Sequence, residues 1–406
     1  MPPPRMKGQQ NMSANKADRR LCVLNAGSSS LKFGVYAIEG ELRQIELGAV
    51  EGIGGKARLR LTMADGKPVH DVTLDAPDHA AALDAVAALP DGPLVRQGLA
   101  AFGHRVVHGG PDMTAPVVVD AATLTRIEAL NPLAPLHNPP AVAVLRALGE
   151  RFPGVMQVAC FDTSFHRGHP PVADRFAIPD ALYQEGVRRY GFHGLSYEYI
   201  AGALAEQMPE IALGRVAVAH LGAGASMCAL AGGRSVDSSM GFTALDGLPM
   251  ATRSGSVDAG VILWLQQQKG WSADRVEHFL YEECGLKGLS GVSNDMRTLL
   301  ASEAPLAKLA VEYFVYHVAK TAGSLAASMG GIDGMVFTAG IGERSPEIRA
   351  RVLRRLGWLG FVLDEAANQA ARTRLTRPDS PRPAFVIPTD EELVIARHTL
   401  GLLGGA

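Results

Sequence analysis

A strand, a turn of small residues and a second strand occur twice in this 406-residue chain, about 195 positions apart. Residues 21–36 read LCVLNAGSSSLKFGVY, and residues 216–231 read VAVAHLGAGASMCALA. In each segment two short apolar runs flank a turn of Gly, Ala or Ser, which is typical of a β-hairpin. Two such units with matching flanks predict a duplicated domain, with a phosphate site between its halves.

The first unit opens a series of antiparallel hairpins, and helical patterns alternate with strands after it. Strands are predicted over residues 21–24, 31–38, 45–50, 57–63, 68–74, 155–160, 216–220 and 335–338, and helices over 78–89, 120–130, 139–150, 306–329 and 345–356. The strand at 335–338 leads into a predicted turn at 339–342. Ser345, Pro346 and Glu347 then supply the N-cap, N1 proline and first-turn acid of the helix that follows.

Composition excludes several classes of protein. With 39 basic and 41 acidic side chains the net charge is −2, which argues against nucleic-acid binding. No apolar run is long enough for a transmembrane helix, and the polar, basic residues 1–19 lack the apolar core of a secretory signal, so we expect a disordered tail there. The four cysteines show no CxxC spacing, which favours reduced thiols in a cytoplasmic protein.

Three turns of small residues are candidates for phosphate binding. Asn25–Ser30 brings backbone N–H groups close to an anion, and Lys32 adds a positive charge. The alternative is an ordinary hairpin turn with a surface lysine. A second turn covers residues 220–226, and a third at 340–343 lies between a strand and a helix. Each turn alone is weak, but three in one chain favour nucleotide binding.

The familiar short motifs are absent or out of place. The chain has no GxxxxGK[ST], GxSxG or HExxH string, which argues against a Walker P-loop, a serine hydrolase and a zinc peptidase. A GxGxxA string at residues 52–57 falls between predicted strands and opens no helix. We therefore do not interpret it as a dinucleotide fingerprint.

Five polar residues are candidates for chemistry. Arg105 alternates with apolar residues on a predicted strand, so it needs an anionic partner. Asp162 follows a strand, where it serves as a base, a metal ligand or the start of an Asx turn. His193 lies between glycines, as a functional residue or a packed loop histidine, and Arg253 lies in a loop, where a surface ion pair is the alternative. Thr389 and Glu392 form a predicted capping box, which leaves Glu391 free to face a metal.

Taken together, these segments resemble the acetate kinase family. The matching strings run in family order from residue 21 to about 398: LNAGSSSLKF, GHRVVHGG, FDTSFH, RRYGFHG, HLGAGAS, SMGFTALDGLPMATRSG, GVSNDMR, FTAGIGE and TDEELVIAR. The resemblance implies an α/β fold of two duplicated actin-like domains around a nucleotide cleft. Residues 20–163 with 390–406 would form the first domain and residues 164–389 the second, nucleotide-binding domain.

The family's activity would be reversible transfer of the ATP γ-phosphoryl group to acetate, giving acetyl phosphate and ADP. The resemblance also implies Mg²⁺, with Mn²⁺ as an alternative, and a cytoplasmic homodimer without nucleic acid or membrane partners. Its implied catalytic residues are Asp162, Arg105, Arg253 and His193, and its implied metal residues are Asn25 and Glu391. The implied acyl pocket is Arg105, Val107, Leu136, Phe192 and Ala244. The implied nucleotide contacts are Lys32, His220, Leu221, Gly222, Ala223, Gly224, Asp295, Met296, Arg297, Gly340, Ile341, Gly342, Glu343 and Arg344.

Five positions depart from the family pattern. Ala223 and Arg344 replace asparagines of the phosphate and adenine turns, which bears on nucleotide affinity. Ala244 stands where the family usually has proline beside the acyl pocket. After GFHG, Leu195 and Tyr197 stand where the family usually has threonine and histidine. A kinase of propionate or another short acid would use the same machinery, since one methylene changes binding by only about 1–3 kcal/mol. The alternative from another class is an actin-like ATPase that makes no acyl phosphate.

Overall fold

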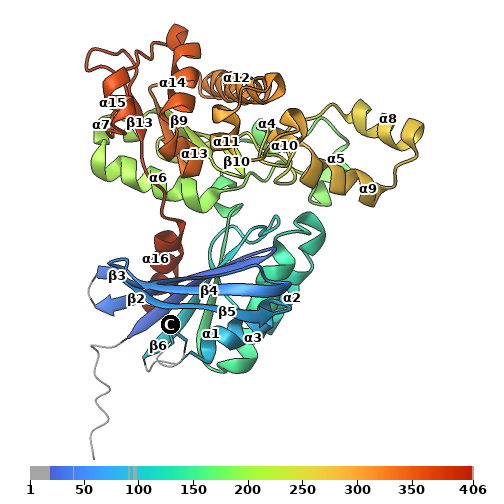
Figure 1. Cartoon of the computed structure of the whole chain (residues 1–406), viewed down its shortest axis with the longest axis vertical. Coiled ribbons are helices and arrows are strands. Elements are labelled where there is room, and N and C mark those ends of the chain that lie inside the picture. Colours follow the sequence, from blue (N-terminus) through green and yellow to red (C-terminus); the bar gives the residue numbers. More distant parts are fainter. Residues whose placement is uncertain (1–18, 40, 90–91, 95–97, 405–406) are drawn as a thin grey trace, which may run out of the picture.

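The computed structural model describes residues 19–39, 41–89, 92–94 and 98–404, so all but the last residue of the predicted tail at 1–19 lies outside the described residues. The chain forms two lobes, each built on one β-sheet with helices against it (Figure 1). None of the helices in the described ranges is both long and apolar enough to cross a membrane.

The first sheet has eight strands in the order β5-β4-β3-β2-β1-β6-β8-β7. They are β1 (Arg20–Gly27), β2 (Ser30–Glu39), β3 (Glu41–Glu51), β4 (Gly55–Met63), β5 (Pro68–Ala76), β6 (Leu99–Val106), β7 (Val117–Val118) and β8 (Met156–Phe161). The predicted opening of antiparallel hairpins is confirmed over β1–β5. The helices of this part of the chain are α1 (His79–Ala87), α2 (Ala121–Glu128) and α3 (Asn138–Arg151), which confirm the three predicted there.

The second sheet has five strands in the order β11-β10-β9-β12-β13. They are β9 (Arg215–Leu221), β10 (Ala225–Ala231), β11 (Arg234–Ser238), β12 (Gly334–Thr338) and β13 (Ala384–Val386). The pairs β11–β10 and β10–β9 are antiparallel, and β9–β12 and β12–β13 are parallel. The series β3-β2-β1-β6-β8 of the first sheet has the same order of antiparallel and parallel pairs. The duplication predicted from the two hairpins is thereby confirmed.

Alternation along β9 explains how the second sheet is covered on both faces. Ala217 and Ala219 join the core that includes Phe314 of α12 (Pro305–Ser328), whereas Val216 and Val218 join the core of α6 (Gly194–Gln207). The remaining helices of this region are α4 (Pro171–Asp174), α5 (Asp180–Gln184), α7 (Pro209–Ala212), α8 (Ala259–Lys269), α9 (Ala273–His278), α10 (Gly285–Ser290), α11 (Met296–Ala301), α13 (Ala339–Arg344), α14 (Pro346–Arg355) and α15 (Glu365–Gln369).

The last helix, α16 (Glu391–Gly404), returns to the first lobe (Figure 1). Val394 and Ile395 pack with Val23 and Cys160 in one apolar cluster on that sheet. Gly103 lies in the middle of β6, and a Cβ there would come within 2.4 Å of the Thr399 hydroxyl, so the glycine lets the helix lie close. The predicted first domain, residues 20–163 with 390–406, likewise places the C-terminal helix with the first lobe. The domain boundaries themselves stay a prediction.

Two local predictions were wrong. Residues 339–342, expected to be a turn, begin the short helix α13. The capping box at Thr389 and Glu392 does not form, because Asp390 Oδ1 accepts the hydrogen bond of the Leu393 N–H at 2.9 Å and caps α16 instead. Glu392 accepts a hydrogen bond from Gln44 Nε2 at 3.4 Å.

Candidate active site

A row of polar residues crosses the first sheet where its strands end. Asn25 of β1 is paired with Lys32 of β2 on one side and with Arg105 of β6 on the other. Arg105 is in turn paired with Cys160 of β8, and Asp162 follows two residues later. Directly paired residues point to the same face of a sheet, so the strand register alone brings these four polar side chains together.

Arg105 is the centre of this row. Its Nε and Nη2 donate to the two carboxylate oxygens of Asp162 at 2.9 and 2.6 Å, and its Nη1 donates to Asn25 Oδ1 at 3.3 Å. Glu391 Oε2 is 3.8 Å away. Asp162 is buried, and the two carboxylates raise the pKa of Arg105 against the opposing effect of burial. The anionic partner that the sequence required for Arg105 is therefore Asp162.

The same region supplies oxygen donors for a divalent cation. Glu391 is the first residue of α16, and burial raises the pKa of its carboxyl while Arg105 and Lys32 act to lower it. With the amide oxygen of Asn25 and the carboxylate of Asp162 it forms an all-oxygen set, the kind that Mg²⁺ prefers alongside water and phosphate. Among the described residues no three His, Cys, Asp or Glu side chains form a preassembled metal cage. The set therefore fits a cation that brings ligands of its own.

His193 enters the site from the other lobe. It precedes α6 in a left-handed backbone conformation (φ 57°). Its ring stacks on His220 with centroids 4.1 Å apart, and its Nδ1 lies 2.7 Å from Ser226 Oγ. Burial and the nearby cationic groups hold the pKa of His193 well below its ordinary value. The imidazole is therefore neutral at physiological pH.

Arg253 lies beside His193. Its Nη1 donates to the Ala244 carbonyl at 2.6 Å, and in the described part of the chain it makes no ion pair with a carboxylate. A Cβ on Gly224 would lie 2.8 Å from Arg253 Nη2 and 3.3 Å from His193 Nε2, so both side chains approach the bare turn between β9 and β10. Burial lowers the pKa of Arg253. A partly buried guanidinium without an acidic partner is ready to receive an anion.

These groups line a cavity of about 240 Å³. Its walls are Arg105, Val107, His137, Asp162, Phe192, His193, His220, Gly222, Ala223, Gly224, Ala244, Arg253 and Glu391. All the predicted catalytic residues are thus brought together. Leu136, predicted for the acyl pocket, is half-buried and does not line the cavity; its neighbour His137 does. Burial and the two arginines lower the pKa of His137 to about 4.

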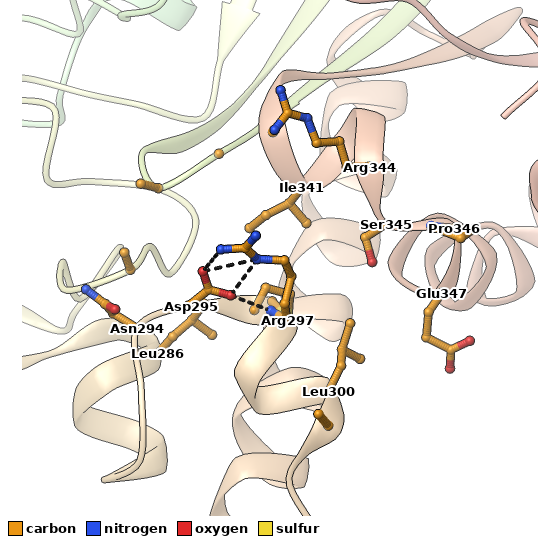
Figure 2. A pocket seen from close by; sticks show the side chains of 16 residues that line it. Leu286, Asn294, Asp295, Arg297, Leu300, Ile341, Arg344, Ser345, Pro346 and Glu347 are labelled. Carbon is orange, nitrogen blue, oxygen red and sulfur yellow. Dashed lines mark hydrogen bonds and ion pairs between the residues drawn. The ribbon is translucent and has the colours of Figure 1, made fainter. Parts of the chain in front are cut away.

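A second cavity of about 620 Å³ adjoins the first, and Gly222 and Ala223 line both. Figure 2 shows polar side chains that line it. Asp295 is the N-cap of α11, Arg297 lies in that helix, and Arg344 is the last residue of α13. Asp295 pairs with Arg297 at 2.6 Å, and this hydrogen bond lowers the pKa of Asp295 to about 2. Its other lining residues include the predicted Met296, Gly340 and Ile341 and the unpredicted Ala251, Leu286, Asn294, Leu300, Ala301, Ser345, Pro346 and Glu347.

Four predicted nucleotide contacts lie outside both cavities. Lys32 is exposed on β2, and Leu221 is buried in the core of the second lobe. Gly342 and Glu343 lie on α13, where the Gly342 carbonyl accepts a hydrogen bond from Arg349 and the Glu343 carboxylate accepts one from the Thr389 N–H. The family motifs therefore predicted which segments line the cavities more accurately than they predicted which individual residues do so.

Known proteins match the chain over nearly its whole length. The acetokinase family profile matches residues 20–397. The acetate kinase of Nitrobacter hamburgensis is 55% identical over 395 residues, covering 94% of this chain and 96% of that protein. The acetate kinase of Rhizobium meliloti is 53% identical, with coverages of 94% and 98%.

Solved structures agree with these relatives. A Porphyromonas gingivalis acetate kinase has a TM-score of 0.85 at 35% identity, covering 95% of this chain and all of that one. A Francisella tularensis propionate kinase has a TM-score of 0.87 at 35% identity, covering 94% and 99%. Two sheets of one topology, together with the match to solved acyl kinases, define the class, a kinase with the duplicated actin-like fold. Within that class, the chain belongs to the acetokinase family.

Proposed function

We propose that this protein is an acetate kinase that transfers the γ-phosphoryl group of ATP to acetate reversibly, by direct in-line transfer. The observation that carries the proposal is the pair of partly buried arginines, Arg105 and Arg253, which face one cavity from different lobes together with His193. That cavity is small enough for a short carboxylate, and the adjoining cavity is within the usual range for a nucleotide-sized ligand.

The reaction brings one anion to another, so charge stabilisation is the main requirement. Acetate is already ionised and needs no strong base. Arg105 would bind its carboxylate while the methyl group contacts Val107, Phe192 and Ala244. A carboxylate oxygen forms the new bond to the γ-phosphorus, and the electron pair of the breaking bond leaves with the β-phosphate oxygen of ADP. Arg253 and His193 would stabilise the charge on the transferring group.

Asn25 and Glu391 would hold Mg²⁺, or Mn²⁺ in its place, largely through water, with Asp162 close by. When bound, the cation would neutralise charge on the nucleotide phosphates. The chain's own contribution is the orientation of its oxygen donors: the Asn25 amide oxygen is fixed by its hydrogen bond from Arg105, and Glu391 by the start of α16. Asp162 would also orient Arg105 through its bidentate pairing.

We propose that the larger cavity receives adenosine. Asp295, Met296 and Arg297 would bound it on one side, and residues 340–344 would lie along it. The turn from His220 to Gly224 would contact the phosphates, since it joins the two cavities and its glycines and alanine let an anion approach the backbone closely. Lys32, across the cleft, would add a phosphate contact when the lobes close on the nucleotide.

Propionate is the second candidate acceptor. Ala244 stands where the family usually has proline, which leaves the acyl pocket less filled, and one solved neighbour is titled a propionate kinase. The same catalytic groups would serve either acid. The expected discrimination between them is small, since one methylene is worth about 1–3 kcal/mol in an apolar pocket.

We further propose a cytoplasmic homodimer. All four cysteines are free thiols, as a reducing compartment keeps them. Helix α8 exposes Val261, Leu263 and Trp264 to between 44% and 53%, an unusual density of apolar side chains on one short helix. A second copy of the chain would cover this surface, and sedimentation of the purified protein tests it: a dimer is expected, and a monomer at micromolar concentration contradicts the proposal.

The reaction is tested by incubating the protein with MgATP and acetate, propionate or butyrate and trapping acyl phosphate with hydroxylamine. Acyl hydroxamate is expected with acetate and is expected to disappear in Arg253→Ala. The order of rates among the three acids then ranks the acceptors. ATP hydrolysis without acyl phosphate from any acid would contradict the proposal and favour an actin-like ATPase.

A further inference from the structure

A buried chain of hydrogen bonds ends on the inner nitrogen of His193. The hydroxyl of Tyr197 lies 2.5 Å from Ser226 Oγ, and Ser226 Oγ lies 2.7 Å from His193 Nδ1. Tyr197 and Ser226 are fully buried. Among the described residues, Ser226 is the one hydrogen-bond partner of the Tyr197 hydroxyl, and these two contacts are the ones made by the Ser226 side chain. Tyr197 is also one of the departures from the family pattern.

Counting the hydroxyl hydrogens shows in which direction the hydrogen bonds of this chain are donated. If Tyr197 donates to Ser226 and Ser226 donates to His193 Nδ1, both hydroxyl hydrogens have acceptors. If His193 Nδ1 carries the proton and donates to Ser226, then one hydroxyl hydrogen, from either Ser226 or Tyr197, is left without an acceptor inside the protein. An orphaned buried donor is costly, so the first arrangement is favoured.

We propose that Tyr197 and Ser226 act as positioning residues that fix the tautomer of His193, so that its Nε2–H faces the cleft as a hydrogen-bond donor. The inference rests on the proposed function for its consequence: in that tautomer His193 donates to an oxygen of the transferring phosphoryl group. In the opposite tautomer Nε2 would present a lone pair, and the phosphoryl oxygens would be repelled.

The surroundings of His193 agree with a neutral donor. A Cβ on Gly224 would lie 3.3 Å from Nε2, and Arg253 Nη2 borders the same space. His220 stacks against the ring with planes 13° apart, and its own Nδ1 lies 2.9 Å from Ser196 Oγ. If His193 were protonated, its positive charge would lie beside the positive charges of Arg105 and Arg253. His193 thus contributes a directed N–H, while Arg105 and Arg253 contribute the charge.

Nitrogen NMR of histidine-labelled protein tests the tautomer directly. Protonated and unprotonated ring nitrogens have widely separated ¹⁵N shifts, and loss of signals in His193→Gln assigns the residue. We expect Nε2 protonated and Nδ1 unprotonated in the wild-type protein. Protonation at Nδ1 instead would overturn the proposal, whatever the activity of the protein.

Tyr197→Phe removes only the terminal donor. Ser226→Ala removes the donor to Nδ1 itself, and because one hydrogen bond of this kind is worth about a fivefold change in an equilibrium, we expect the His193 shifts to move towards a mixture of tautomers and kcat for acyl phosphate to fall roughly fivefold, with KM for ATP nearly unchanged. Tyr197→Phe leaves Ser226 able to donate and removes only its polarisation by Tyr197, so we expect the same changes in smaller size. Tyr190→Phe is the matched control, since the buried Tyr190 hydroxyl donates to the Gly186 carbonyl instead, and it should leave the His193 shifts unaltered. Unchanged shifts and kcat in Ser226→Ala would overturn the proposal.

A double-mutant cycle separates this role from packing. In a Ser226→Ala background the chain is already broken, so adding Tyr197→Phe should reduce kcat no further. If the losses in kcat of the two single variants instead multiplied in the double variant, Tyr197 and Ser226 would not act through one chain of hydrogen bonds. If the wild-type protein makes no acyl phosphate, the proposed function fails, and the spectra alone still decide the tautomer.

Discussion

The turns at the heads of the two sheets have the same backbone plan and opposite chemistry. Around β1–β2 the register places the ionisable or amide side chains of Lys32, Asn25 and Arg105 side by side. Around β9–β10 the corresponding turn is almost bare, and Gly224 leaves room for Arg253 and His193 to approach. Both copies carry a polar pair on their strands, Asn25 with Lys32 and His220 with Ser226, but the turn from Gly222 to Gly224 adds no polar side chain. A duplicated scaffold can therefore hold the cation and acceptor on one side and the phosphates on the other.

The largest expected effect comes from the polar row of the first lobe. Arg105→Ala should lower kcat for acyl phosphate by about a thousandfold or more, as loss of a phosphoryl-binding arginine does elsewhere. Arg105→Lys keeps the charge without the fork that matches Asp162, and should recover only part of the loss. Thermal unfolding is measured alongside, because Asp162 loses its partner. Activity within tenfold of wild type in Arg105→Ala would mean that the row does not carry the chemistry.

In the second lobe, adding a side chain should be harmful. Gly224→Ala would force Arg253 or His193 to move, and a displacement of about 1 Å can cost about a hundredfold in rate. Gly202→Ala is the matched control, since a Cβ there meets no atom within 4 Å. Steady-state kinetics of the two variants make the comparison. Equal activities would show that the bare turn is not required.

An intermediate effect is expected on stability. Burial and Asp390 raise the pKa of Glu392 from 4.5 to about 7. The folded state then holds this proton more tightly than the unfolded chain, so Glu392 favours folding at low pH and costs stability as pH rises from 4.5 to 7. The free energy of unfolding of Glu392→Gln should therefore rise relative to that of wild type over that window, by about 3 kcal/mol above pH 7. Urea unfolding at pH 5 and pH 8 measures it.

Glu303→Gln serves as the control for that experiment. Lys308 lowers the pKa of Glu303, so its neutral variant should show no gain at pH 8. A constant difference between Glu392→Gln and wild type at both pH values would mean that ionisation of Glu392 is not the cause.

The smallest expected effect tests a departure from the family pattern. Ala223 lines both cavities where an asparagine is usual. Ala223→Asn should restore one polar contact to the nucleotide phosphates and lower KM for ATP about fivefold, with kcat little changed. A raised KM would indicate that the turn is too narrow for the longer side chain.

The alternation of apolar residues and the small-residue turns predicted the two repeated hairpins. Which polar side chains lie together in the site depends on the strand register. The two hairpins, their duplicated setting and the segments that line the cleft follow from apolar alternation and small-residue turns. The cap of α16 was mistaken because Thr389 and Asp390 are both good N-cap residues, and a one-residue choice between them depends on where the chain leaves the second lobe.

The remaining misses come from contacts between distant segments. His137 lies one residue after the predicted Leu136, and only the packing of the loop before α3 decides which of the two faces the cavity. The chain from Tyr197 through Ser226 to His193 joins α6 with β10, and no spacing in the sequence links them. The departure of Tyr197 from the family pattern is the sequence signal that points to this chain of hydrogen bonds.

The position of α16 in the chain sets an order of synthesis. Its Val394, Ile395 and Ala396 complete an apolar cluster whose other members include Leu21 and Val23 of the first strand. About 230 residues separate the end of β8 from α16, which at ribosomal rates is roughly 10–45 s of translation. During that interval one face of the first sheet lacks its cover and the site lacks Glu391. The lobe that is translated first is therefore completed last.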